Sequence, residues 1–192
     1  MVLTRKSIVL LGDIFMNFKF NQCNNVLKIT LLSIFCALSV SVSFLESLIP
    51  ISPVLPPGTK LGFSNIITMF VCATFGIHFS IIIIIVKSLF VAFSRGFIAF
   101  MLSLLAGLFS TFITGILIRY FSNSISNIFI GIIGASVHNF TQILVASFFV
   151  GNIIFYYLPF LLLVSLFTGS LTGIVFNIIL PILYKQYSLF KH

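Results

Sequence analysis

Apolar runs with very few charged residues between them are the feature that most constrains the fold of this chain. Only 6% of its 192 residues are charged, whereas soluble domains carry about a quarter. Its mean hydropathy is +1.28, and 60% of its residues are hydrophobic. A soluble core of this length cannot bury so much apolar surface, so lipid must be the solvent for most of the chain. The sequence therefore predicts an all-α integral membrane protein.

The apolar runs predict a bundle of about six transmembrane helices, since a spanning helix needs roughly 20 mainly apolar residues. The expected spans are residues 27–49, 61–77, 79–94, 97–118, 127–150 and 154–183. The second and third are short and separated only by "GIH", so they form either a tight hairpin or one long kinked helix. Pro159 and Pro181 predict a kink or an interfacial first turn in the sixth. We expect a transmembrane domain at 27–185, with cytoplasmic segments at 1–26 and 186–192.

The basic residues predict the orientation, because Lys and Arg in short loops mark the cytoplasmic side. With both termini inside, only Lys60 and Arg95 lie outside, and Lys87 falls within a span. The cytoplasmic basic residues are then Arg5, Lys6, Lys19, Lys28, Arg119, Lys185 and Lys191. The net charge of +8 is spread along the chain without forming a patch, so we expect no nucleic-acid partner.

The stretch "FLESLIPISPVLPPGTKLGFSNI" at residues 44–66 gathers polar chemistry between two apolar spans. An ionised Glu46 at membrane depth costs about 2.5–3.5 kcal/mol, falling toward the interface. It either reaches water there or contacts a ligand beneath the following loop. Four prolines and Gly58 make that loop stiff, so it loses little entropy on closing over a ligand. Asn65, early in the second span, adds an amide donor.

The segment "HNFTQ" at 138–142 places three strong hydrogen-bonding side chains in the fifth span. His138 and Gln142 share a helix face, and Asn139 stands about 100° away. These groups either join helices, at roughly 0.6 kcal/mol per bond, or recognise a polar, partly planar ligand. We expect no metal site, because no second histidine or carboxylate accompanies His138 at ligand spacing.

Two further patterns have both a structural and a functional interpretation. The basic trio Lys60, Lys87 and Arg95 forms an anion-attracting funnel, unless Lys87 merely extends its ammonium to the interface. Ser33, Ala37 and Ser41 form a stripe of small residues on the first span. We call it the small-residue stripe; it serves either packing within the bundle or docking to a partner membrane protein.

Three segments resemble one known family. "FLESLIP…PPGTKLGFSNIITM", "GASVHNFTQILVA" and "YYLPFLLLVSLFTGSLTG" are similar to segments of small bacterial membrane proteins called Gx transporters, over about residues 30–177. That family is also labelled heptaprenyl diphosphate synthase component I. It resembles the substrate-binding S components of energy-coupling-factor (ECF) vitamin transporters. The resemblance implies six helices in the bacterial cell membrane, an outward pocket capped by the first loop, and docking through small residues on helix one.

Three functional hypotheses follow, and none makes the chain an enzyme by itself or assigns it a cofactor. The first is an S-component-like subunit that binds a small molecule for uptake by a separate membrane module with ATPases, since the chain has no P-loop. The second is a non-catalytic membrane subunit of heptaprenyl (polyprenyl) diphosphate synthesis, since Asp13 and Glu46 are too few for a Mg²⁺–diphosphate site. The third is a proton-coupled secondary transporter using Glu46 and His138, which the absence of inverted repeats disfavours.

Overall fold

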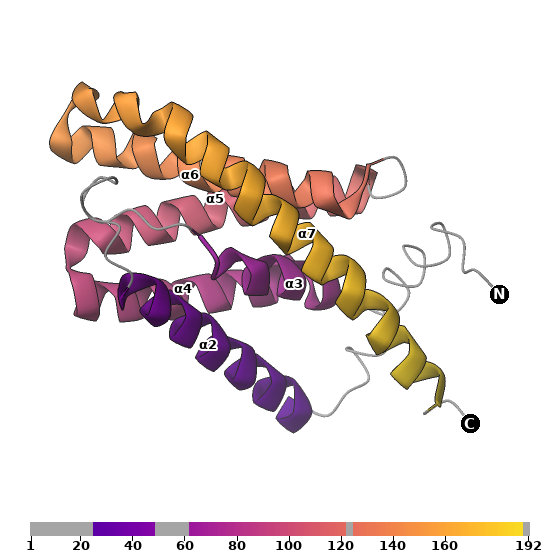
Figure 1. Cartoon of the computed structure of the whole chain (residues 1–192). Helices are drawn as coiled ribbons and strands as arrows, with labels where there is room; N and C mark the ends of the chain where they lie inside the picture. Colours follow the sequence, from indigo (N-terminus) through magenta and orange to yellow (C-terminus); the bar gives the residue numbers. More distant parts are fainter. Residues whose placement is uncertain (1–24, 49–61, 122–124, 190–192) are drawn as a thin grey trace.

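The computed structural model describes residues 25–48, 62–121 and 125–189, and these ranges are almost entirely helical (Figure 1). The elements are α2 (Asn25–Leu48), α3 (Asn65–Phe75), α4 (Ile77–Arg95), α5 (Phe97–Phe121), α6 (Asn127–Val150), the 3₁₀ helix η1 (Asn152–Tyr157) and α7 (Leu158–Leu189). The predicted cytoplasmic extension, the proline-rich loop and Lys60 lie outside the described residues.

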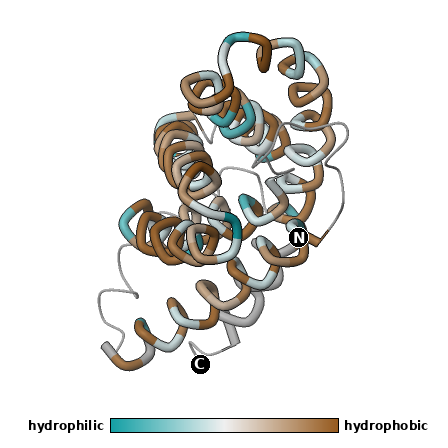
Figure 2. The backbone as a smooth tube through the Cα atoms, turned by 90° about the vertical axis from the view of Figure 1, so that its left-hand side faces the viewer, coloured by the Kyte–Doolittle hydropathy of each residue, from teal (hydrophilic) through white to brown (hydrophobic). Residues whose placement is uncertain are grey.

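The expected all-α membrane bundle is confirmed. Five of the described helices are long and apolar enough to cross a membrane. Apolar residues dominate most of their length (Figure 2), and large hydrophobic side chains are exposed on the outer faces of the bundle. The sixth helix, α3, has 11 residues and is shorter than the span expected at 61–77, because Gly62 to Ser64 form a turn before it. In that turn, the backbone N–H of Asn65 donates to the Gly62 carbonyl at 2.9 Å.

Single glycines reverse the chain direction between consecutive helices. Gly76, Gly96 and Gly151 have φ of 91°, 86° and 90°, with ψ between 170° and 178°. This combination is essentially accessible only to glycine. Gly76 therefore joins α3 and α4 in a tight hairpin. A tight hairpin was one of the two arrangements expected around "GIH". The 3₁₀ helix η1 supplies the separate first turn expected ahead of the sixth span.

Helices α6 and α7 touch backbone to backbone. A methyl group added at Gly131 would collide with the Gly169 carbonyl oxygen, and one added at Gly173 would collide with the Cα of Ile128. The two helices lie side by side along much of their length (Figure 1). Close approach of this kind lets dispersion forces hold membrane helices together without a hydrophobic driving force.

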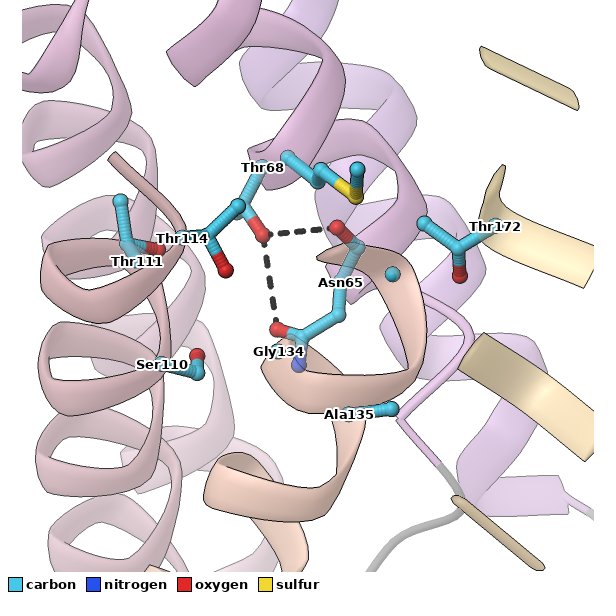
Figure 3. A pocket seen from close by; sticks show the side chains of 10 residues that line it. Asn65, Thr68, Ser110, Thr111, Thr114, Gly134, Ala135 and Thr172 are labelled. Carbon is cyan, nitrogen blue, oxygen red and sulfur yellow. Dashed lines mark hydrogen bonds between the residues drawn. The ribbon is translucent and has the colours of Figure 1, made fainter. Parts of the chain in front are cut away.

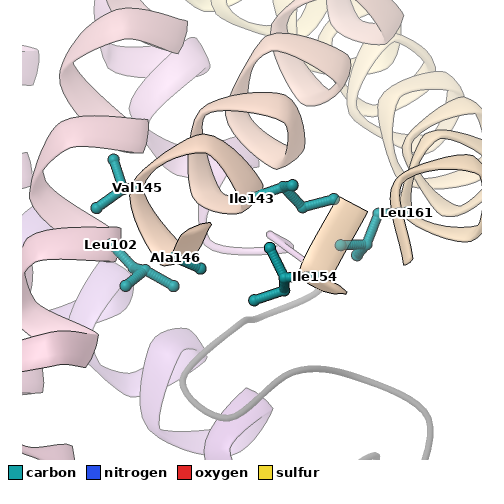
Figure 4. Packing of buried hydrophobic residues seen from close by; sticks show 6 residues of the cluster. All are labelled: Leu102, Ile143, Val145, Ala146, Ile154 and Leu161. Atoms are coloured by element: carbon teal, nitrogen blue, oxygen red, sulfur yellow. The ribbon is translucent and has the colours of Figure 1, made fainter. Parts of the chain in front are cut away.

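An apolar cluster joins α5, α6, η1 and α7 near the end of the bundle that carries Gly151. It consists of Leu102, Ile143, Val145, Ala146, Ile154 and Leu161 (Figure 4). Helix α3 lies in the middle of the bundle and packs against each of the other five long elements. Because α3 is short and begins inside the bundle, the turn before it enters the protein interior.

Candidate functional site

The turn at Gly62–Ser64 meets polar side chains from α2 and α4. The backbone N–H of Phe63 donates to Oε1 of Glu46 at 2.6 Å. On the other side, Nζ of Lys87 donates to the Ser64 hydroxyl oxygen at 3.2 Å. Glu46 and Lys87 also interact electrostatically. The turn is thus held between the carboxylate of Glu46 and the buried ammonium of Lys87.

Helix α6 reaches the same turn through His138. A methyl group at Gly62 would lie 3.5 Å from Cδ2 of His138, an ordinary contact distance, so this position of the turn faces the imidazole. Nε2 of His138 is 3.1 Å from Nε2 of Gln142, one helical turn further along. Asn65 lies next to Gly62, at the start of α3. We call the following group the polar cluster: Glu46, Ser64, Lys87, His138 and Gln142.

The exposed fractions of Glu46 and Lys87 show whether these two charged side chains reach water or lie inside the bundle. Glu46 is 8% exposed and Lys87 is 2% exposed. Glu46 therefore does not reach water at the interface, and Lys87 does not extend its ammonium out of the bundle. Buried charges require partners, since transferring an unpaired ion into an apolar interior is prohibitively costly. Each of these groups neutralises part of the field of the other.

One hydrogen-bonding position in the polar cluster is open. Oε2 of Glu46 is buried and has no hydrogen-bond partner in the described part of the chain. Most buried polar atoms have such a partner, and an exception calls for an unseen group. The open oxygen is a place where a ligand that donates a hydrogen bond can bind.

Two of the predicted site residues lie apart from the polar cluster. Asn139 is 1% exposed, and its Nδ2 donates to the Leu161 carbonyl on α7 at 3.0 Å, so it braces α6 against α7. Arg95 is exposed in the last turn of α4, and no hydrogen bond joins it to the cluster within the described ranges. Lys60 is outside those ranges. The structure therefore brings together Glu46, Lys87, His138 and Gln142, with Asn65 beside them.

The small-residue stripe of α2 faces outward. Ser33, Ala37 and Ser41 are all exposed, whereas Ser39 and Ser43 on the opposite face are buried. The stripe does not pack within the bundle, which leaves docking to a partner as the prediction for it. The buried serines had not been expected from the sequence.

Sequence reasoning also missed a second polar region, a cavity of about 20 Å³ in the centre of the bundle. Figure 3 shows hydroxyl-bearing side chains from several helices around it. Its lining residues are Asn65, Thr68, Met69, Ser110, Thr111, Thr114, Gly131, Gly134, Ala135 and Thr172. The available signal was the recurrence of Ser and Thr at helical spacing in three separate apolar spans. We call this space the hydroxyl chamber.

The polar cluster gathers hydrogen-bonding groups of several chemical kinds. It offers an ammonium, an imidazole, an amide and an open carboxylate oxygen, all from helices and one backbone turn. No group of three His, Cys, Asp or Glu residues close enough to hold a metal ion occurs among the residues that the structure describes.

Comparison with known proteins gives one result. No curated protein and no solved structure matches the chain. The family model described as heptaprenyl diphosphate synthase component I matches residues 35–179, a range that includes α3 to α6 and most of α2 and α7. That range carries every described residue of the polar cluster. The chain belongs to the heptaprenyl diphosphate synthase component I family.

Proposed function

We propose that this chain is a non-catalytic, ligand-binding membrane subunit that serves polyprenyl diphosphate synthesis. The observation that carries the proposal is the burial of Lys87, whose ammonium is held inside the bundle at the polar cluster. A lysine ammonium binds phosphate as a compact point charge. The family description names a heptaprenyl diphosphate synthase component, and the polar cluster suits a diphosphate that keeps one proton: its oxygens would accept from Lys87, and its P–O–H would donate to the open Oε2 of Glu46.

The small number of acidic residues supports the proposal that this chain is non-catalytic. Asp13 and Glu46 are the only acidic residues of the chain. Enzymes that transfer prenyl groups with Mg²⁺ need several oxygen ligands for the metal, because hard cations bind oxygen. Catalysis therefore belongs to a partner subunit, and this chain supplies a membrane site that retains the substrate or product.

Direct binding tests this function. The protein is purified in lipid nanodiscs, and farnesyl diphosphate is added while thermal unfolding is followed. At a ligand concentration of 100 times Kd, binding adds about 2.7 kcal/mol to the free energy of unfolding. Lys87→Gln is expected to remove this stabilisation. Arg95→Gln, which removes an exposed cation from the same helix, is the matched control and should retain it.

A second candidate function is capture of a small molecule for uptake by a separate coupling module with ATPases. The observation that favours it is the Gly62–Ser64 turn, which brings backbone into contact with both charged side chains of the polar cluster. The outward-facing small-residue stripe offers a docking surface for that module. The same unfolding assay with vitamins and flavins separates the two functions. Stabilisation by a water-soluble vitamin, abolished in His138→Ala, with none by farnesyl diphosphate, would replace the first proposal by the second.

We also propose the orientation that the basic residues predict. Both termini, with the segments 1–26 and 186–192, face the cytoplasm of a bacterial cell, and the Gly62–Ser64 turn lies toward the outer side. This places the polar cluster in the outer half of the membrane, as the second candidate function requires. A subunit that exchanges prenyl diphosphates with a cytoplasmic synthase would take them in from the inner side, so a test of the orientation also separates the two functions. The excess of basic residues on the proposed cytoplasmic side supports the orientation. Arg95 at the end of α4 and Arg119 at the end of α5 then lie on opposite sides of the membrane.

A further inference from the structure

We infer that the bundle contains a second ligand site, formed by the hydroxyl chamber and an adjoining apolar chamber, which binds a long-chain alcohol drawn from the bilayer. The apolar chamber has a volume of about 330 Å³ and lies between α2, α3 and α7. Its lining residues are Phe35, Leu38, Ile66, Ile67, Met69, Phe70, Thr172, Val175 and Phe176. None of the polar-cluster residues lines this site, which does not depend on the function proposed for that cluster.

The two chambers meet at shared residues. Met69 and Thr172 line both of them. In Figure 3, Thr172 faces the hydroxyl chamber across from Asn65. The two chambers therefore adjoin at these residues, and a single ligand with its polar end in one chamber and its hydrocarbon part in the other would contact both side chains.

The described lining of both chambers carries no charged group, and this excludes an ionised ligand. Among the residues that the structure describes, no Lys, Arg, His, Asp or Glu lines either chamber. A phosphate or carboxylate placed there would be a buried charge without a partner, which proteins avoid at very high cost. The occupant of this site is therefore neutral, which distinguishes it from a ligand of the polar cluster.

Hydrogen bonding in the hydroxyl chamber selects the type of polar group. Three lining hydroxyls donate their protons to backbone carbonyls of their own helices: Thr68 to Asn65 at 3.0 Å, Ser110 to Gly107 at 3.1 Å, and Thr172 to Thr168 at 2.7 Å. Their oxygen lone pairs remain as acceptors. The chamber thus presents acceptor oxygens and, from the Asn65 amide, N–H donors. An alcohol matches both, because it donates one hydrogen bond and accepts others, whereas an ether or a ketone cannot donate.

The volume of the hydroxyl chamber limits the ligand's polar group to one hydroxyl. The volume of the apolar chamber allows a long hydrocarbon chain. The hydroxyl chamber, at about 20 Å³, is close to the roughly 10–15 Å³ that one water needs. The apolar chamber is about twice the 150 Å³ of an engineered cavity that binds benzene, so it holds on the order of a dozen carbon atoms.

Access to the apolar chamber is from the lipid. Its rim residue Leu38 is 49% exposed on the outer face of α2. A chain longer than the chamber can therefore extend into the bilayer, and the alcohol can enter sideways between α2 and α7. No movement of the Gly62–Ser64 turn is required.

The test is equilibrium binding of tritium-labelled farnesol to the full chain in lipid nanodiscs. We expect saturable binding, competed by unlabelled farnesol and about tenfold less well by farnesyl methyl ether, which has lost one hydrogen bond. Thr172→Val removes an acceptor at nearly constant volume and should weaken binding about tenfold. Thr74→Val, on α3 but outside both chambers, is the matched control and should leave binding unchanged.

A second variant keeps the test decisive if Thr172→Val fails to fold. Val175→Phe adds bulk inside the apolar chamber and should abolish farnesol binding while leaving the polar cluster intact. The proposal is overturned by any of three results: binding that does not saturate, equal competition by the methyl ether, or unchanged affinity in Val175→Phe. Competition by farnesyl diphosphate at the strength of the alcohol would also overturn it. None of these results bears on Lys87, so the function proposed above is judged separately.

Discussion

Glu46 near the end of α2 and Phe63 in the turn before α3 are joined by a 2.6 Å hydrogen bond, in which the backbone N–H of Phe63 donates to Oε1. The two residues are 17 positions apart in the sequence. The bond fixes the turn against α2, and Lys87 fixes it against α4 through Ser64. A carboxylate that the sequence places near the membrane interface thus acts inside the protein, as an anchor for backbone.

Replacing Glu46 tests how much this anchor contributes. Glu46→Ala leaves the Phe63 N–H without its acceptor, and we expect the free energy of unfolding to fall by about 1–3 kcal/mol. Glu46→Gln keeps an acceptor oxygen and should cost less. Denaturation by SDS in mixed micelles measures both. Ser47→Ala, whose hydroxyl bonds only within α2, is the control and should stay within about 0.5 kcal/mol of the parent. Equal losses in Ala and Gln variants would show that charge, and not the hydrogen bond, holds the turn.

Glu46 and Lys87 are expected to be energetically coupled. In a double-mutant cycle with Glu46→Gln and Lys87→Gln, the loss of stability in the double variant should differ from the sum of the single losses by about 0.5–3 kcal/mol. The reason is that each single variant leaves one buried charge without its counter-charge. The same cycle with Arg95→Gln in place of Lys87→Gln should be additive within about 0.3–0.5 kcal/mol. Additivity in both cycles would mean that the two buried charges act independently.

Sequence patterns predict this fold well because the bilayer imposes a strong, local requirement on each span. The apolar runs locate most helix ends within a few residues, and the residues around "GIH" form the hairpin that was one of their two expected arrangements. The short α3 is the exception. Its expected first residues form a turn because Ser64 and Phe63 find partners on α4 and α2, which are contacts that no local pattern reveals.

The site is predicted less completely, because three-dimensional neighbours decide which polar residues meet. His138 and Gln142 share one helix face, so their grouping is visible in the sequence. Asn139 follows His138 by one position, and the amide of Asn139 donates to the Leu161 carbonyl of α7. The hydroxyl chamber draws its residues from separate helices, each of which offers only ordinary Ser and Thr residues when considered alone.

Asn139 and His138 are therefore expected to respond differently to substitution. Asn139→Leu removes the bond to the Leu161 carbonyl and should lower stability by about 0.5–1.5 kcal/mol without changing ligand affinity. His138→Ala alters the surface on which Gly62 packs and should weaken binding of whichever ligand the polar cluster accepts. Unfolding and binding measured on the same preparations separate the two effects. A loss of ligand affinity in Asn139→Leu would show that Asn139 belongs to the binding site.

The glycines between α6 and α7 are expected to be intolerant of alanine. A methyl group at Gly173 would collide with backbone atoms of Asn127 and Ile128, which cannot move aside as a side chain can. We expect Gly173→Ala to cost about 1–3 kcal/mol in SDS denaturation. Gly115→Ala is the control, since its methyl would lie 3.4 Å from the Cys72 sulfur, an ordinary contact. Similar stability of the two variants would contradict the backbone contact.

The proposed orientation predicts which ends of the α4–α5 hairpin are accessible from outside the cell. Ser94→Cys and Tyr120→Cys place thiols at exposed positions near opposite ends of this hairpin and leave every basic residue in place. The three native cysteines are first replaced by serine. In intact cells, a membrane-impermeant maleimide should label the thiol at position 94, and it should label the one at position 120 only after permeabilisation. The reverse pattern would place the Gly62–Ser64 turn toward the cytoplasm. The polar cluster would then take its ligand from inside the cell, which is incompatible with uptake but compatible with a subunit that holds a cytoplasmic synthase's substrate.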